Sequence, residues 1–332
     1  MLKRILKYNT TAGYLVILLV TIVSWWPSLH SDNVQQMAFD YIPMPLYEML
    51  TGFISQYVLA SRLAAIGLIL LAGFYLLSLN EKYSILRERA LFPAFFFILI
   101  VSSYDDLHRL HPALIALLFF LPALDKILAS YKTEGLSTNY FEATFLLGAG
   151  SLFYFNLIYF ILIVWIALLV LRPVIWREWV LSIMGILTPW FFFLVYDYLT
   201  TESIDRTVDL FVVNITTGYE LMLVFIPHMI FMGILLFLII LASRKVIISM
   251  AKMRVLTRKI YVLFFWIFLV GLSAWFILET ANIELIVLVA VPVSFLLSNY
   301  MLSINSAFWS NFILWSLIVA VQAIVWLPLI IA

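Results

Sequence analysis

The sequence predicts an all-α protein, a polytopic transmembrane helical bundle with short interfacial amphipathic helices in its outer loops. Of its 332 residues, 65% are hydrophobic and only 11% are charged, and the mean hydropathy is +1.12. A soluble domain has about 25% charged residues. Apolar runs long enough to enter a bilayer recur along the whole chain, and most basic residues lie in the segments between them.

About eleven spans are expected, some of them short, because a spanning helix needs roughly 20 apolar residues. The apolar runs lie near 12–29, 56–79, 90–104, 111–129, 140–156, 157–171, 180–197, 221–243, 260–279, 284–299 and 308–330. The pair 140–156 and 157–171 is either two short spans that meet near Tyr154 or one long bent helix with a re-entrant piece. No soluble domain or flexible linker interrupts the runs, so the prediction is a single integral membrane domain, 1–332.

The distribution of basic residues predicts the orientation of the bundle. If the N-terminus is cytoplasmic and the eleven runs alternate, all but three of the 19 Lys and Arg residues fall on the cytoplasmic side. The exceptions are Arg62, Arg109 and Arg206. Counting 140–171 as one span would put the basic segment 244–259 outside, so two short spans are preferred. The lipid bilayer is thus the first predicted partner, and nothing in the charge pattern predicts a nucleic-acid partner.

The segment 102–112, Ser-Ser-Tyr-Asp-Asp-Leu-His-Arg-Leu-His-Pro, is the strongest candidate site. Asp105 and Asp106 lie there between two apolar runs, on the predicted outer side. Ionisable groups at a membrane edge are costly and therefore point to function. One carboxylate could accept a proton from an acceptor hydroxyl while the other orients that group or holds a divalent cation. The alternatives are a solvated loop, or a helix cap made by Asp105 or Asp106 before the helix that starts near Pro112.

Two histidines and three arginines extend this candidate site. His108 and His111 are three residues apart and would share one helix face. Without a third nearby ligand this spacing is a weak metal motif, so no metal site is predicted and the pair is assigned to substrate binding. Arg62, Arg109 and Arg206 come from three outer segments, and guanidinium groups suit bidentate binding of a lipid phosphate. The alternative is that Arg206 and Arg109 pair with the acids next to them in the sequence.

The chain has no cysteine, so disulfides, thiolate metal sites and thiol nucleophiles are excluded. The first outer segment, about 28–55, mixes acids with large apolar residues and prolines, which is typical of amphipathic helices in the membrane interface. It contains Asp32 and Asp40.

The order of these parts resembles the GT-C class of membrane glycosyltransferases over about residues 1–200, with 201–332 as additional spans. The chain contains, in this order, a first span, a long outer segment with Asp40 (or Asp32), two more spans, an outer loop with Asp105-Asp106, and then short spans. The resemblance implies a polyprenyl-phosphate-linked sugar donor and transfer on the outer face. It implies catalytic roles for Asp40, Asp105 and Asp106. A soluble outer domain typical of such enzymes is missing, so acceptor recognition would come from short loops or a partner.

A second resemblance covers 145–189. Its motifs are Gly148, Gly150-Ser151-Leu152-Phe153-Tyr154, Leu171-Arg172-Pro173, Trp176-Arg177-Glu178-Trp179 and Gly185-Ile186-Leu187-Thr188-Pro189. They look like those of a polytopic family known mainly from Bacteroidota, which implies a bacterial inner membrane and no particular activity. Two other functions therefore stay open, a non-catalytic subunit that scaffolds a cell-envelope complex of membrane proteins, and a lipid or solute transporter.

Overall fold

The computed structural model describes residues 2–8, 10–30, 43–54, 57–132, 138–201, 212–213, 226–278 and 283–331, and the regular elements in these ranges are all helices. The first half has α1 (Leu2–Lys7), α2 (Thr11–His30), α4 (Pro45–Ile54), α5 (Val58–Tyr83), α6 (Phe92–Val101), the 3₁₀ turn η1 (Asp105–Leu107), α7 (Pro112–Ala129) and η2 (Ser130–Lys132). The second half has α8 (Asn139–Ser151), η3 (Phe155–Phe160), α9 (Ile161–Leu171), α10 (Trp176–Thr201), α12 (Ile226–Ser249), η4 (Met250–Lys252), α13 (Val255–Ile277), η5 (Ile283–Leu285), α14 (Ile286–Ser303) and α15 (Ala307–Ile331).

Eight of the described helices are long and apolar enough to cross a membrane, so the chain is a multi-pass membrane protein. They are α2, α5, α7, α10, the helix that runs through α12 and η4, α13, the helix from η5 through α14, and α15. The remaining apolar runs form the shorter α6, α8 and η3–α9, so the count of about eleven spans is not confirmed. Between 140 and 171 the helix breaks, because α8 ends at Ser151 and Tyr154 is extended before η3 begins.

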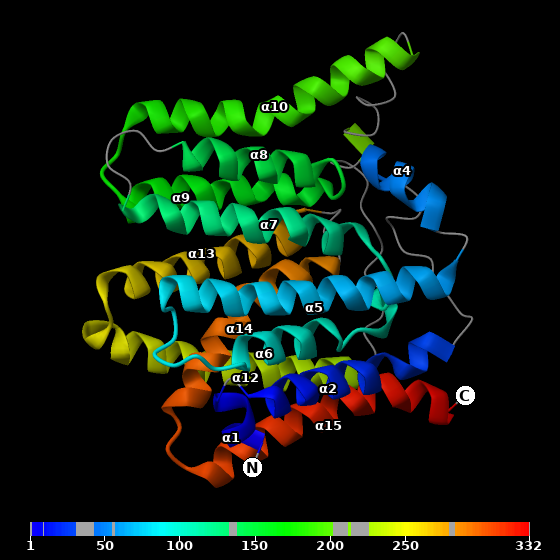
Figure 1. The fold of residues 1–332 in the computed structure, drawn as a ribbon, viewed down its shortest axis with the longest axis vertical. Coiled ribbons are helices and arrows are strands. Elements are labelled where there is room, and N and C mark those ends of the chain that lie inside the picture. Colours follow the sequence, from blue (N-terminus) through cyan, green and yellow to red (C-terminus); the bar gives the residue numbers. More distant parts are fainter. Residues whose placement is uncertain are drawn as a thin grey trace.

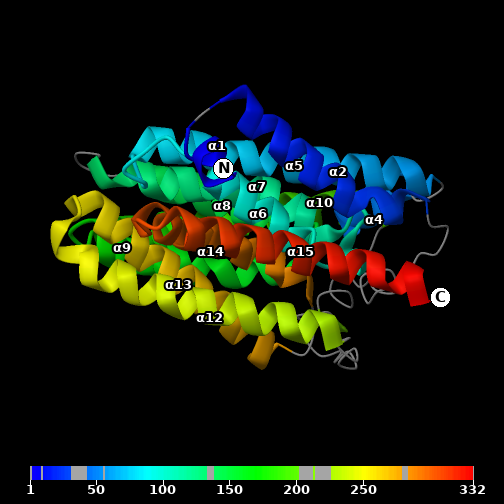
Figure 2. The same cartoon turned by 90° about the horizontal axis from the view of Figure 1, so that it is seen from below.

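The long helices lie side by side along one direction, and their connections gather at the two ends of the bundle (Figures 1 and 2). α6 runs through the interior, where all ten of its residues are buried. It packs mainly on α14 and α5, and α15 packs on α2. One apolar core therefore joins residues from both halves of the chain, from Leu2 to Val325.

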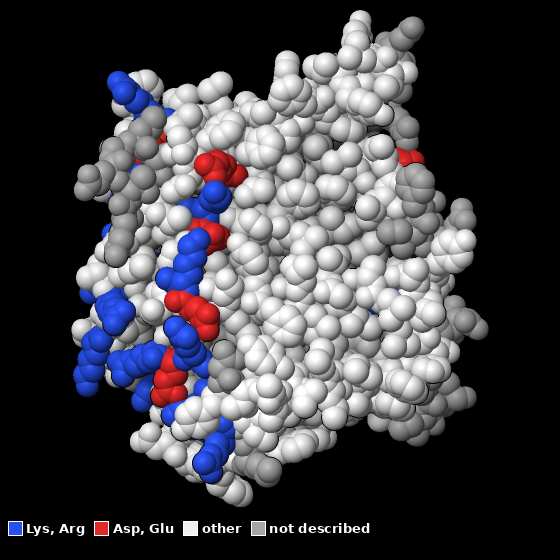
Figure 3. Space-filling model, in the orientation of Figure 1, with Lys and Arg blue, Asp and Glu red and all other residues white. Residues whose placement is uncertain are grey.

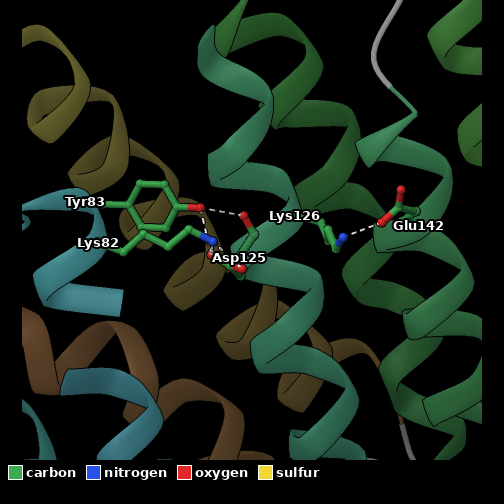
Figure 4. A network of polar contacts seen from close by, with 5 residues as sticks. All are labelled: Lys82, Tyr83, Asp125, Lys126 and Glu142. Carbon is green, nitrogen blue, oxygen red and sulfur yellow. Dashed lines mark hydrogen bonds and ion pairs between the residues drawn. The ribbon is translucent and has the colours of Figure 1, made fainter. Parts of the chain in front are cut away.

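Charged residues gather at one end, which we call the basic end; it carries the connections α5–α6, α7–α8, α9–α10, α12–α13 and α14–α15 (Figures 1 and 3). Figure 3 shows a band of Lys, Arg, Asp and Glu there, while most of the same face is uncharged. Ion pairs link successive elements along this band. They join Lys7 to Glu88, Lys82 to Asp125 and Lys126 to Glu142, the last two drawn in Figure 4 with Tyr83, which donates a hydrogen bond to Asp125.

The opposite end carries the loop between α6 and α7, the break at Tyr154, and α4. α4 occupies part of the segment 28–55 in which interfacial helices are predicted, and its Tyr47 is buried against the loop 102–111. Tyr47 donates its hydroxyl to the carbonyl of Leu110, at 3.1 Å, and the amide of Leu46 donates to the carbonyl of Leu152. α4 therefore ties together the two loops that turn at this end.

Candidate functional site at the loop between α6 and α7

The loop forms because α6 stops at Val101 and the chain turns before α7. Tyr104 is extended (φ −118°, ψ 105°), Asp105–Leu107 make one 3₁₀ turn, and α7 begins at Pro112, whose missing N–H suits a first helical turn. The N-cap position of α7 is His111, with no capping side chain. The expectation that Asp105 or Asp106 caps this helix is therefore wrong, and so is the expectation that His108 and His111 share a helix face.

His108 is buried, 2% exposed, and joins the loop to α2. Its Nε2 lies 3.2 Å from the carbonyl oxygen of Ser102 and its Nδ1 lies 2.7 Å from Ser28 Oγ. A carbonyl oxygen only accepts, so Nε2 carries the proton, and a neutral ring then accepts from the Ser28 hydroxyl. The ring stacks on Trp25, with 4.1 Å between centroids, and the Trp25 indole donates to Ser102 Oγ at 2.9 Å.

Burial keeps both loop histidines neutral. It lowers the pKa of His108 to about 3, although the hydrogen bond to Ser102 opposes this, and the nearby Arg62 charge lowers it further. Burial also lowers the pKa of His111 to about 3, with Arg109 adding to the effect. Arg62, in α5, is only 5% exposed. The structure thus places His108, His111 and Arg62 inside the bundle, beneath the surface of the loop.

The two carboxylates lie nearer the surface. Burial raises the pKa of Asp106 to about 6, and the neighbouring Asp105 raises it too, while Arg109 acts in the opposite direction. Asp105 keeps 35% of its side chain exposed, and its Oδ1 lies 3.8 Å from Nε2 of His228. The His228 ring also stacks on Tyr104, with 4.9 Å between centroids. Asp105, Asp106, Arg109 and His228 therefore form one polar group at this end.

Sequence reasoning missed His228 as a member of this group. His228 lies in the first turn of α12, 123 residues after Asp105 in the sequence. Its position in the outer part of the apolar run 221–243 was the one available signal. The contact itself depends on how α12 packs in the bundle, which the sequence pattern does not reveal.

A second loop at the same end repeats the local geometry. Tyr154 is extended (φ −137°, ψ 102°) like Tyr104, and a 3₁₀ turn follows it. Asn156, which lies in this 3₁₀ turn, is 3% exposed and donates a hydrogen bond to the Tyr154 hydroxyl at 3.3 Å. Burial raises the pKa of Tyr154 well above its usual value, and the carboxylate of Glu284, itself 4% exposed, contributes. Glu284 is thus a buried acid that the sequence analysis did not assign to the site.

The structure brings together only part of the predicted site. Asp105, Asp106 and Arg109 form its surface, and Arg62 and His108 lie close together below them. Asp40 and Arg206 lie outside the described residues. Within the part of the chain that the structure describes, no three His, Asp or Glu side chains come close enough to hold a metal ion.

Comparisons of the chain with protein-family models, with curated proteins and with solved structures found no match.

Proposed function

We propose that the protein is a membrane glycosyltransferase or polymerase that uses a polyprenyl-phosphate-linked sugar at the end of the bundle opposite the basic end. The observation that carries the proposal is Asp106, a carboxylate with a pKa raised to about 6, held beside Arg109. A general base works best when its pKa is near the operating pH. A guanidinium group beside it suits a lipid phosphate.

The reaction needs one proton acceptor and one anion-binding group. Asp106 takes the proton of an acceptor hydroxyl, whose oxygen attacks the anomeric carbon of the donor sugar. The new glycosidic C–O bond forms as the bond from the anomeric carbon to the phosphate oxygen breaks. The polyprenyl phosphate leaves with the bonding electrons, and Arg109 stabilises its charge. Asp40, in the first outer segment, is the other candidate for the base, on the GT-C resemblance.

The buried members of the predicted site have positioning roles in this proposal. His108 and Arg62 lie too deep to touch a substrate at the surface, and the hydrogen bonds of His108 connect the loop to α2. They hold the loop in place while Asp105 and His228 lie beside the base. The cytoplasmic N-terminus and the bacterial inner membrane belong to the same proposal, because the basic end then faces the cytoplasm as the positive-inside rule requires.

The test is binding of the lipid product. Delipidated protein in nanodiscs is mixed with undecaprenyl phosphate, and native mass spectrometry counts the bound copies. We expect one retained copy in the wild type, and loss of it in Arg109→Gln. Arg177→Gln removes an exposed charge at the basic end and serves as the matched control. Transfer from a lipid-linked sugar is then compared in Asp40→Asn, Asp105→Asn and Asp106→Asn.

Equal lipid binding in all three proteins, with unchanged transfer in the carboxylate variants, would overturn the proposal. That result favours the scaffold function instead. The observation that supports a scaffold is that the hydrogen bonds of His108 go to other residues of the bundle, Ser28 and Ser102. A scaffold subunit co-purifies with other membrane proteins and tolerates substitution of Asp105 and Asp106.

A further inference from the structure

A groove of about 490 Å³ opens between α12 and α13 toward the basic end. α12 and α13 both pack on α14, and Figure 2 shows them together along one edge of the bundle. The lining from α12 is Leu236, Ile239, Ile240, Ser243, Arg244, Ile247 and Ile248, and α13 contributes Phe268. Most of these side chains follow one another at helical spacing, so the groove runs along α12. It is apolar for most of its length and has a cation near one end.

The position of Arg244 along α12 matches that of a lipid headgroup. α12 ends five residues later, at Ser249, so the Arg244 backbone lies about 7.5 Å from the helix end. Between Arg244 and that helix end, Ile247 and Ile248 are each 66% exposed. A long arginine side chain in such a place extends toward the interface while its stem stays on apolar surface. The groove therefore offers an apolar channel for an acyl chain and a guanidinium group at the depth of the phosphate.

Among the described residues, the positive charge around this groove is not balanced by acids, unlike that of several other residues at the basic end. Elsewhere Lys7, Lys82, Lys126 and Arg172 each form an ion pair with an acid. The segment 244–259 contains six basic residues and no acid. Five of them are exposed, and none of the six pairs with a carboxylate in the described part of the chain; these five are Arg244, Lys245, Lys252, Arg254 and Arg258. A concentrated positive charge without internal partners attracts anionic headgroups.

We propose that this groove is a binding site for one anionic phospholipid of the leaflet at the basic end. One acyl chain lies along Leu236, Ile240 and Phe268, and Arg244 binds the headgroup phosphate, with the Ser243 hydroxyl beside it. The exposed cations of 245–258 select a net negative headgroup over a zwitterionic one. This site is independent of the transferase proposal, since it lies at the other end of the bundle and uses none of the same residues.

The probes are phosphatidylglycerol and phosphatidylcholine with identical acyl chains. Delipidated protein is titrated with an equal mixture, and native mass spectrometry measures the ratio of bound lipids. We expect the wild type to prefer phosphatidylglycerol. In Arg244→Gln the preference falls about fivefold, the weight of one basic side chain near an anionic surface. Ile240→Trp places a large ring in the groove at a side chain that is 58% exposed, and should reduce retention of either lipid while the protein still folds.

Arg177→Gln is the matched control, because Arg177 is also exposed at the basic end but lies over the Trp176 ring, away from the groove. It should keep the wild-type preference, and so should Arg109→Gln at the opposite end. Equal retention of the two lipids by the wild type would overturn the proposal. So would an equal loss in Arg177→Gln and Arg244→Gln, which assigns the preference to net charge, or an Ile240→Trp protein that retains lipid like the wild type.

Discussion

His228 Nε2 lies 3.8 Å from Asp105 Oδ1, and the same imidazole stacks on Tyr104. This relationship joins the first turn of α12 to the loop between α6 and α7. The candidate site is therefore formed by the packing of α12 against this loop and not by the loop alone. Any chemistry assigned to Asp105 and Asp106 therefore depends on α12 as well as on the loop that carries them.

The first prediction concerns the pH dependence of glycosyl transfer. Asp106 must be deprotonated to accept a proton, and its pKa is raised to about 6. Transfer should therefore rise with pH through about 6 and level off above about 7. Asp106→Asn should lower the rate by about 10²–10⁴-fold, the usual contribution of a general base. Initial rates measured from pH 5 to pH 8 test this. A wild-type profile that is flat across the window contradicts the role of Asp106 as base.

The second prediction concerns acid stability. Burial lowers the pKa of His108 and His111 to about 3, so below pH 6.5 the unfolded chain binds more protons than the folded protein. Their contribution to stability is complete above about pH 6.5 and is lost as pH falls toward 3. Each histidine should lower the free energy of unfolding by about 3 kcal/mol at pH 4 relative to neutral pH. Asp106 acts in the opposite direction, since its raised pKa weakens the fold as pH rises from about 4 to about 6.

The check is the melting temperature in detergent at pH 7 and pH 4. The wild type should melt lower at pH 4. His108→Gln should lower the melting temperature at pH 7, because it loses the stack on Trp25, but it should show a smaller further drop at pH 4. Asp106→Asn should enlarge the drop at pH 4. An identical acid drop in the wild type and His108→Gln would mean that other groups determine the acid response.

The third prediction concerns the ion pair between Arg172 and Glu178, whose side chains are 7% and 0% exposed and whose Nη1 and Oε1 atoms are 3.0 Å apart. Arg172→Gln leaves a buried carboxylate without its counter-charge and should cost about 3–5 kcal/mol. Lys126→Gln, which breaks an exposed pair with Glu142, should cost less than about 1 kcal/mol. Chemical unfolding of both variants tests the contrast. Arg172→Met combined with Glu178→Leu should recover most of the loss, and a double variant as unstable as Arg172→Gln would contradict this.

Sequence reasoning located the helical runs well because each depends on local composition. The apolar run that became α6 and the break at Tyr154 both follow from residues close together in the chain. The contacts of the site do not follow in this way. The stack of Trp25 on His108 and the approach of His228 to Asp105 join separate helices, so they depend on which helices become neighbours. For Glu178, a position near a span end predicts that it faces water or pairs with a basic residue such as Arg172. The pair with Arg172 is present, but the burial of both side chains depends on helix packing and was not predicted.

The fourth prediction tests the close packing of α8 on α10 at Gly148. A Cβ atom added at Gly148 would lie 2.6 Å from the carbonyl oxygen of Ile186 and 3.2 Å from its Cα, both of them backbone atoms that cannot rotate away. Gly148→Ala should therefore destabilise the protein by about 1–3 kcal/mol. Gly67→Ala in α5 is the matched control, because nothing lies within 4 Å of its added Cβ and alanine favours a helix. Equal melting temperatures for the two variants would show that α8 and α10 can separate at little cost.

The fifth prediction concerns orientation, and the absence of cysteine makes it direct to test. Tyr57 lies at the start of α5, at the end that carries α4, and Ser306 lies between α14 and α15 at the basic end. In intact cells an impermeant thiol reagent should label Tyr57→Cys but reach Ser306→Cys only after the membrane is opened. Because the two positions lie at opposite ends of the bundle, their labelling should be opposite whatever the orientation. Labelling of Ser306→Cys alone in intact cells would show that the protein has the opposite orientation in the membrane. Asp106 would then lie on the cytoplasmic side, which excludes transfer on the outer face.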